Sequence, residues 1–136
     1  MNLLGVDYGS KNIGLAIWRE GADVVLPFGV LENNEQAAGK LAVLFGDEKI
    51  DKIVLGLPLS LDGKENKNTV RVHSFAGELK ASGTAVEFFD ERFSSQAADR
   101  SAGGASRDEK AAMLILEDYL KKFTPPYSSP YKGEDN

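Results

Sequence analysis

Three acidic residues occupy positions where a carboxylate is expected to be partly withdrawn from water. Asp7 interrupts an apolar run, Glu91 follows two phenylalanines, and Asp108 lies near the start of a long amphipathic segment. Burying a carboxylate is costly unless it is paired, hydrogen-bonded or bound to metal, and converging carboxylates raise one another's pKa values. Divalent cations remove that repulsion, and oxygen-only ligands favour Mg²⁺ or Mn²⁺ over zinc. Two such ions promote phosphoryl transfer.

Each acid also has a purely structural interpretation. Asp7 can accept hydrogen bonds from the Gly-Ser turn that follows it. Glu91 can pair with its neighbour Arg92 at a solvated strand end. Asp108 can complement a helix dipole. For Asp7 and Glu91, position alone leaves both interpretations open.

The periodicity of the last helix favours a metal-ligand role for Asp108. Ser106 and Glu109 have the spacing of a capping box, which places Asp108 in the first helical turn. At about 100° per residue, Asp108 lies at the centre of the apolar stripe, Glu109 and Glu117 point away, and Asp118 lies at the margin. The stripe consists of Ala111, Ala112, Ile115, Leu116 and Tyr119. An acid that only complements the dipole has no need to face inward.

Other catalytic chemistries have little support in the sequence. The chain contains no cysteine, which excludes disulfides, thiolate metal sites and a cysteine nucleophile. The single histidine, His73, falls in the middle of an expected helix and is interpreted as a surface residue.

The expected elements form an α/β fold with a five-stranded mixed sheet flanked by helices. Strands are predicted over residues 3–8, 13–18, 24–31, 53–57 and 85–89, with Pro27 marking the third as an edge strand. Helices are predicted over about 34–45, 66–80, 94–103 and 107–123. The second of these is expected to turn Val70, Val72, Phe75, Ala76 and Leu79 toward the core. Sites in such sheets form at the carboxyl ends of the parallel strands, close to Asp7 and Glu91.

Length and charge set further limits. The 136 residues suit one domain, expected over 1–123, followed by a disordered tail over 124–136. No signal-peptide pattern or long apolar stretch is present, which predicts a cytoplasmic protein without a membrane anchor. The net charge of −5 disfavours a tight, non-specific nucleic-acid binder. It does not exclude an enzyme, because acids at a metal site help to bind substrate once cations are present.

Several motifs together resemble one known family. They are Gly5 to Ala16 (GVDYGSKNIGLA), Val54 to Leu59 with Asp62-Gly63, Arg71-Val72 with Phe75-Ala76, Asp90 to Ser94 (DERFS), and Asp108 to Leu120. In this order, over about residues 3 to 120, the chain resembles the YqgF family, also called RuvX, of pre-16S ribosomal RNA nucleases.

The resemblance implies an RNase H-like fold related to Holliday junction resolvases, and a bacterial role in trimming the 5′ end of the small-subunit ribosomal RNA precursor. It implies catalytic and metal-binding roles for Asp7, Glu91 and Asp108 with Mg²⁺ or Mn²⁺ as cofactor. Lys11, Arg71 and Arg92 fall on basic positions of the motifs and are expected to meet phosphates. The implied partner is structured RNA or branched DNA, bound by a monomer or a weak homodimer.

One segment departs from the family pattern. Family members carry a longer stretch rich in lysine and arginine before the last helix, whereas residues 102–107 are short and nearly uncharged here. The three acids are retained, so the departure bears on substrate grip rather than on catalysis.

Three rival functions are compatible with the sequence. A Holliday junction resolvase uses the same chemistry but needs a dimer, and no dimer stripe is evident. A nucleotide-binding module is suggested by residues 7–10, which look like the phosphate loop of sugar kinases and actin-like ATPases, but those proteins need two lobes. The third is a non-catalytic RNA-binding factor, against which retention of all three acids argues.

Overall fold

The structure is a computed structural model that describes residues 1–58, 64–90 and 105–123. The expected helix over 94–103 and the expected tail lie outside these residues, and the domain boundaries stay a prediction. The described elements are β1 (Leu3–Tyr8), β2 (Asn12–Trp18), β3 (Leu26–Glu32), α1 (Ala37–Asp47), β4 (Lys52–Leu57), α2 (Lys67–Ala81), β5 (Val86–Asp90) and α3 (Arg107–Phe123).

The strands form one mixed sheet in the order β3-β2-β1-β4-β5. β1 pairs antiparallel with β2, and β2 with β3, while β1 pairs parallel with β4, and β4 with β5. The predicted five-stranded mixed sheet is therefore confirmed. β3 begins two residues later than expected and lies at the edge of the sheet, where a strand containing Pro27 is tolerated.

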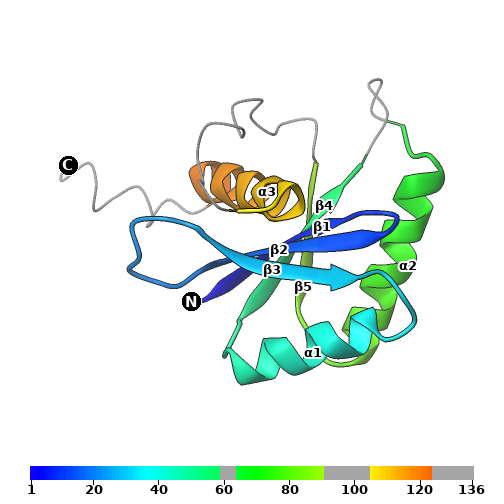
Figure 1. Cartoon of the computed structure of the whole chain (residues 1–136), viewed down its shortest axis with the longest axis horizontal. Coiled ribbons are helices and arrows are strands. Elements are labelled where there is room, and N and C mark those ends of the chain that lie inside the picture. Colours follow the sequence, from blue (N-terminus) through cyan, green and yellow to red (C-terminus); the bar gives the residue numbers. More distant parts are fainter. Residues whose placement is uncertain (59–63, 91–104, 124–136) are drawn as a thin grey trace.

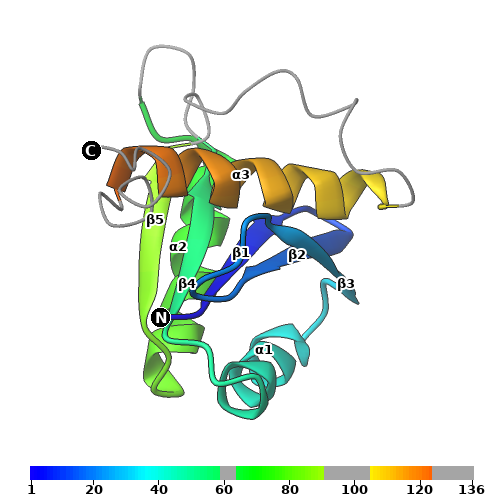
Figure 2. The same cartoon turned by 90° about the vertical axis from the view of Figure 1, so that its left-hand side faces the viewer.

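Helices cover both faces of the sheet: α3 lies on one face, and α1 and α2 lie on the other (Figures 1 and 2). Side chains alternate along β1, so Leu4 and Val6 join the core under α1 and α2, while Leu3 joins the core under α3. Asp7, two residues beyond Gly5, is on the α3 face by the same alternation. No helix in the described parts of the chain is long and apolar enough to span a membrane.

The core face of α2 differs from the prediction at one residue. Val72, Phe75, Ala76 and Leu79 are buried as expected, but Val70 is 59% exposed. Val70 lies about 200° around the helix from Val72, so it belongs to the opposite face. The prediction for Val70 is wrong because the angular position of a residue on the helix, and not its apolar character alone, decides whether it faces the core.

α3 approaches β1 and β2 so closely that two of their residues have to be glycine. A Cβ atom at Gly5 would lie 2.9 Å from the carbonyl oxygen of Ala112 and 3.0 Å from the Cβ of Leu116. A Cβ atom at Gly14 would overlap the carbonyl oxygen of Asp108 and lie 3.0 Å from the Cβ of Asp108. The first turn of α3 therefore packs directly on the backbone of β2.

We expect Gly14→Ala to lower the free energy of unfolding by about 1–3 kcal/mol or more, because the added methyl group forces α3 away from the sheet. Gly77→Ala is the matched control: nothing lies within 4 Å of a Cβ at this position in α2. The control should gain about 0.5–1 kcal/mol from improved helix propensity. Urea denaturation of both variants measures the two effects, and an undiminished stability for Gly14→Ala would contradict the backbone contact.

Candidate active site

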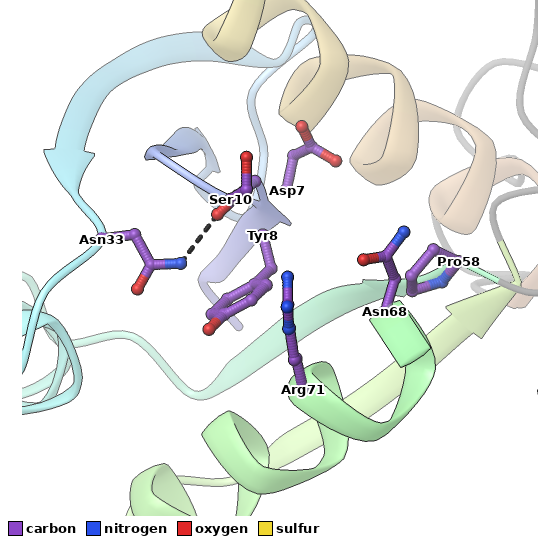
Figure 3. A pocket seen from close by; sticks show the side chains of 8 residues that line it. Asp7, Tyr8, Ser10, Asn33, Pro58, Asn68 and Arg71 are labelled. Atoms are coloured by element: carbon purple, nitrogen blue, oxygen red, sulfur yellow. Dashed lines mark hydrogen bonds between the residues drawn. The ribbon is translucent and has the colours of Figure 1, made fainter. Parts of the chain in front are cut away.

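The close packing of α3 brings two of the predicted acids together. Asp7, near the carboxyl end of β1, pairs in register with Gly14 of β2, and Asp108 lies directly over Gly14. The Asp7 side chain points toward α3 in Figure 3. Both carboxylates are partly buried, and their charges interact. Residues far apart in the sequence thus converge on one end of the sheet.

The proximity of Asp108 perturbs Asp7. Burial, and then the charge of Asp108, raise the pKa of Asp7 to about 6 from an ordinary value of 3.8. Among the described residues, neither carboxylate has a hydrogen-bond or ion-pair partner. Two mutually repelling carboxylates without partners in the described parts of the chain are a donor set that suits a hard divalent cation such as Mg²⁺ or Mn²⁺.

The third predicted ligand cannot be placed beside them. Glu91 lies outside the described residues, directly after the end of β5. Within the described ranges, no group of three acidic or histidine side chains converges. Asp7 and Asp108 therefore form a pair, and a metal-ligand role for Glu91 stays a prediction.

The other acids of α3 differ from their expected positions. The capping box is present: the Ser106 N–H donates to Glu109 Oε1 at 2.9 Å, and the Glu109 N–H donates to Ser106 Oγ at 3.1 Å. Glu109 does not point away from the sheet, however, because its Oε2 accepts from the N–H of Gly29 on β3 at 2.6 Å. Glu117 is half-buried, and burial raises its pKa. Helical periodicity missed these contacts because it describes direction and not the reach of a glutamate.

Asp118, which is expected at the margin of the apolar stripe, is buried, with 7% exposure. It lies ten residues beyond Asp108, which corresponds to about 15 Å along the helix axis. Asp118 therefore does not share the site of Asp7.

A pocket of about 440 Å³ opens beside Asp7 (Figure 3). Its lining comes from the end of β1 and the following turn, the residue after β3, the end of β4, and α2. The lining residues are Asp7, Tyr8, Gly9, Ser10, Asn33, Pro58, Asn68 and Arg71. Among these lining residues, Arg71 carries the positive charge. The Arg71 guanidinium and the Asp7 carboxylate therefore face the same pocket.

Buried hydrogen bonds hold the α2 side of the pocket. Thr69 is fully buried, and its hydroxyl donates to the carbonyl oxygen of Pro58 at 2.9 Å. Asn66 caps α2 by accepting from the N–H groups of Asn68 and Thr69. These bonds fix the first turns of α2 against the end of β4, which directs Asn68 and Arg71 to the pocket.

The opposite side is held through Asn33. Its Nδ2 donates to the carbonyl oxygen of Gly9 at 2.7 Å, and its backbone N–H donates to the carbonyl oxygen of Lys11 at 2.8 Å. The turn between β1 and β2 is thereby tied to the end of β3.

The basic residues expected to meet phosphates divide into three cases. Arg71 lines the pocket that Asp7 lines. Lys11 is exposed in the β1–β2 turn and does not line it. Arg92 lies outside the described residues. His73 is exposed and contacts Glu65 at 3.2 Å, consistent with its interpretation as a surface residue.

Asn33 and Asn68 are pocket residues that the sequence does not predict. A signal was available for Asn68, which precedes Arg71 by three residues and so shares its helix face. Asn33 follows an edge strand, and no local pattern marks its approach to Gly9.

Comparison with known sequences gives a consistent assignment. A family model described as "RuvX: Holliday junction resolvase" matches residues 1–122. A relative from Maridesulfovibrio salexigens, named "Putative pre-16S rRNA nuclease", is 36% identical, and the alignment covers 90% of this chain and 99% of the relative. Relatives of the same name from Bordetella pertussis and Thermus thermophilus are 37% and 33% identical, covering 91% and 90% of this chain and 96% and 98% of theirs.

Solved structures support the fold. Thermus thermophilus RuvC in complex with a Holliday junction substrate is similar with a TM-score of 0.63 at 13% identity, covering 91% of this chain and 97% of that chain. A second Thermus thermophilus RuvC structure has a TM-score of 0.55 at 14% identity, covering 89% and 96%. The similarity confirms the expected RNase H-like fold.

We expect Asp7→Asn to stabilise the metal-free protein at high pH. The folded state keeps a proton on Asp7 up to a pKa of about 6, whereas the unfolded state loses it near 3.8. The wild type therefore loses stability as the pH rises through this interval, and the neutral amide does not. The variant should exceed the wild type by about 2–3 kcal/mol at about pH 8 and match it at about pH 3.5.

Chemical denaturation in the presence of chelator measures this difference. Glu32→Gln, which removes an exposed carboxylate at the end of β3, controls for the loss of one negative charge. An Asp7→Asn protein less stable than the wild type at pH 8 would show that the carboxylate is satisfied within the fold.

Proposed function

The chain belongs to the RuvX family, and from that premise we propose that it is a metal-dependent nuclease that hydrolyses phosphodiester bonds in the 5′-end processing of pre-16S ribosomal RNA. The observation that carries the proposal is the convergence of Asp7 and Asp108 at the end of the sheet, beside a pocket lined by Arg71. The names of the relatives support the substrate class.

The acid pair fits a divalent cation by its chemistry. Asp7 and Asp108 offer carboxylate oxygens without partners among the described residues, and a bound divalent cation would offset their repulsion. Glu91 is the proposed third ligand. Mg²⁺ or Mn²⁺ bound there would supply Lewis-acid activation of water and of the phosphate. Asp7 has to be ionised to act as a ligand, so its raised pKa makes metal binding weaken as the pH falls toward 6.

The pocket is proposed to hold the substrate backbone. The guanidinium of Arg71 can donate two hydrogen bonds to one phosphate group, and the Ser10 hydroxyl and the Asn68 amide add neutral donors. These residues bind and orient the strand so that one phosphate lies next to the acid pair. Orientation of this kind accounts for much of the rate enhancement in phosphoryl transfer.

Branched DNA is the second candidate substrate. It is favoured by the description of the matching family as Holliday junction resolvases. A resolvase has to present two active sites to one junction, which requires a dimer. Ribosomal RNA is preferred here because the curated relatives over nearly the whole chain carry that name.

The proposed substrate determines where in the cell the reaction takes place. An enzyme that trims a ribosomal RNA precursor in a bacterium acts in the cytoplasm. We propose that it works as a monomer or a weak homodimer.

We expect cleavage of a pre-16S RNA fragment to require Mg²⁺ or Mn²⁺ and to stop with chelator. Asp108→Asn should reduce cleavage by at least about a hundredfold, because the amide cannot replace a carboxylate ligand. Glu117→Gln is the matched control, about 13 Å further along α3, and should cut normally. A four-way DNA junction tested in parallel distinguishes the two candidate substrates. Full cleavage activity after exhaustive chelation would contradict the metal-dependent mechanism.

Arg71→Ala is expected to weaken RNA binding and to flatten its salt dependence. Loss of one phosphate contact should reduce the slope of log K against log salt concentration by about 1, because one fewer counterion is released. Lys80→Ala, near the other end of α2, serves as the control for net charge. Filter binding with catalytically inactive protein at several salt concentrations gives both slopes, and equal slopes for the two variants would remove Arg71 from the substrate site.

A further inference from the structure

We propose that Glu109 is a positioning residue that holds Asp108 beside Asp7 by tying the first turn of α3 to a bulge in β3. The proposal rests on the proposed metal-dependent function of the acid pair. Glu109 would not contact the metal or the substrate; it would act through the helix turn that carries Asp108.

The Glu109 carboxylate makes two bonds to backbone donors from different parts of the chain. Its Oε1 accepts from the N–H of Ser106, and its Oε2 accepts from the N–H of Gly29 at 2.6 Å. With both oxygens engaged in hydrogen bonds, the side chain is a tether rather than a free ligand. A capping box by itself requires only the Ser106 bonds.

A bulge in the edge strand β3 makes the N–H of Gly29 available to Glu109. In the pairing of β2 with β3, Leu15 is opposite Gly29 and Ala16 is opposite Pro27, so Phe28 is an extra residue. Gly29 has a φ of +108°, a conformation that favours glycine. Such a bulge redirects backbone groups, and here the Gly29 N–H donates to a side chain of α3.

The tether acts at the point where displacement would matter for the acid pair. Asp108 is adjacent to Glu109 and packs over Gly14, so any shift of this turn moves the Asp108 carboxylate. Like charges on Asp108 and Asp7 repel each other, which opposes the close packing of this turn on the sheet. The turn is also the end of a helix, where hydrogen bonds fray most easily. Glu109 opposes both effects, and Gly14 sets how close the turn can come.

The test compares Mn²⁺ binding to Glu109→Ala and to Ser106→Ala, measured by electron paramagnetic resonance on metal-free protein without RNA. Ser106→Ala is the matched control: it removes the Ser106 Oγ bond of the capping box but leaves both backbone donors to Glu109 in place. Glu109→Ala removes both accepted bonds. Glu109→Asp keeps the negative charge near the helix N-terminus, while its shorter side chain cannot reach both donors.

We expect Glu109→Ala to weaken Mn²⁺ binding about tenfold or more and Ser106→Ala to leave it within about twofold, with thermal melts showing that both variants are folded. Glu109→Asp should weaken Mn²⁺ binding as well, which separates the tether from the charge. Equal Mn²⁺ affinities for Glu109→Ala and Ser106→Ala, or wild-type affinity for Glu109→Asp, would overturn the positioning role.

The outcome is separable from that of the proposed function. A wild type that binds Mn²⁺ but cleaves neither RNA nor DNA would contradict the nuclease proposal, while the comparison of variants would still decide the role of Glu109. A wild type that binds no Mn²⁺ would overturn both.

Discussion

The backbone of α3 rests on the backbone of β1 and β2 at Gly5 and Gly14, and the geometry of the candidate site depends on this contact. Aspartate side chains are short. An aspartate on a strand and an aspartate on a helix can bind the same ion only if the helix lies very close to the sheet. Side chains between the two elements normally prevent so close an approach. Removal of the Cβ atom at Gly14, the residue opposite Asp7, provides that approach at the required position. A fold with a larger residue at this position would keep its topology and lose the acid pair.

The acid pair is a source of instability in the metal-free fold. The raised pKa of Asp7 means that ionising this carboxyl group costs more free energy in the folded state than in the unfolded state, so the folded state loses stability once the group is ionised. The two hydrophobic cores on either side of the sheet offset this effect, since they bury most of the aliphatic side chains of β1, β2 and β4. The site thus lies where the sheet ends and the core gives way to solvent, and the nearby polar bonds of Thr69 and Asn33 keep its walls in place. Stability is supplied by the apolar layers, and the local repulsion is retained for function.

Local patterns in the sequence predict much of the fold and of the acid pair. Asp7 and Asp108 each interrupt an apolar face, which predicts a functional role for both, and they converge as the element order predicts. Apolar runs bounded by turn residues and the helical period of 3.6 residues also located the described strands and helices within a few residues. The same patterns failed where a contact depends on reach rather than direction. Glu109 faces away by helical period yet bonds β3 through its long side chain, and the bulge at Gly29 that receives it has no local signature. The prediction for Val70 fails for a different reason. Val70 is apolar and is expected in the core, but the helical period places it on the exposed face of α2.

The net charge of −5 has a specific consequence for an enzyme that handles a polyanion. A surface with an excess of acids repels nucleic acid over distances of about a Debye length, so encounters that do not engage the site are short. In the proposed site, divalent cations at Asp7 and Asp108 would reverse the sign of the local charge, and Arg71 adds a fixed positive group across the pocket. Binding energy is then concentrated at the reacting phosphate, where it contributes to catalysis, rather than distributed along the strand, where it would only slow product release. Weak binding of the nucleic acid to the protein surface and strong binding of the reacting phosphate are compatible. The first depends on the net charge of the whole chain, and the second depends on the charges at the site.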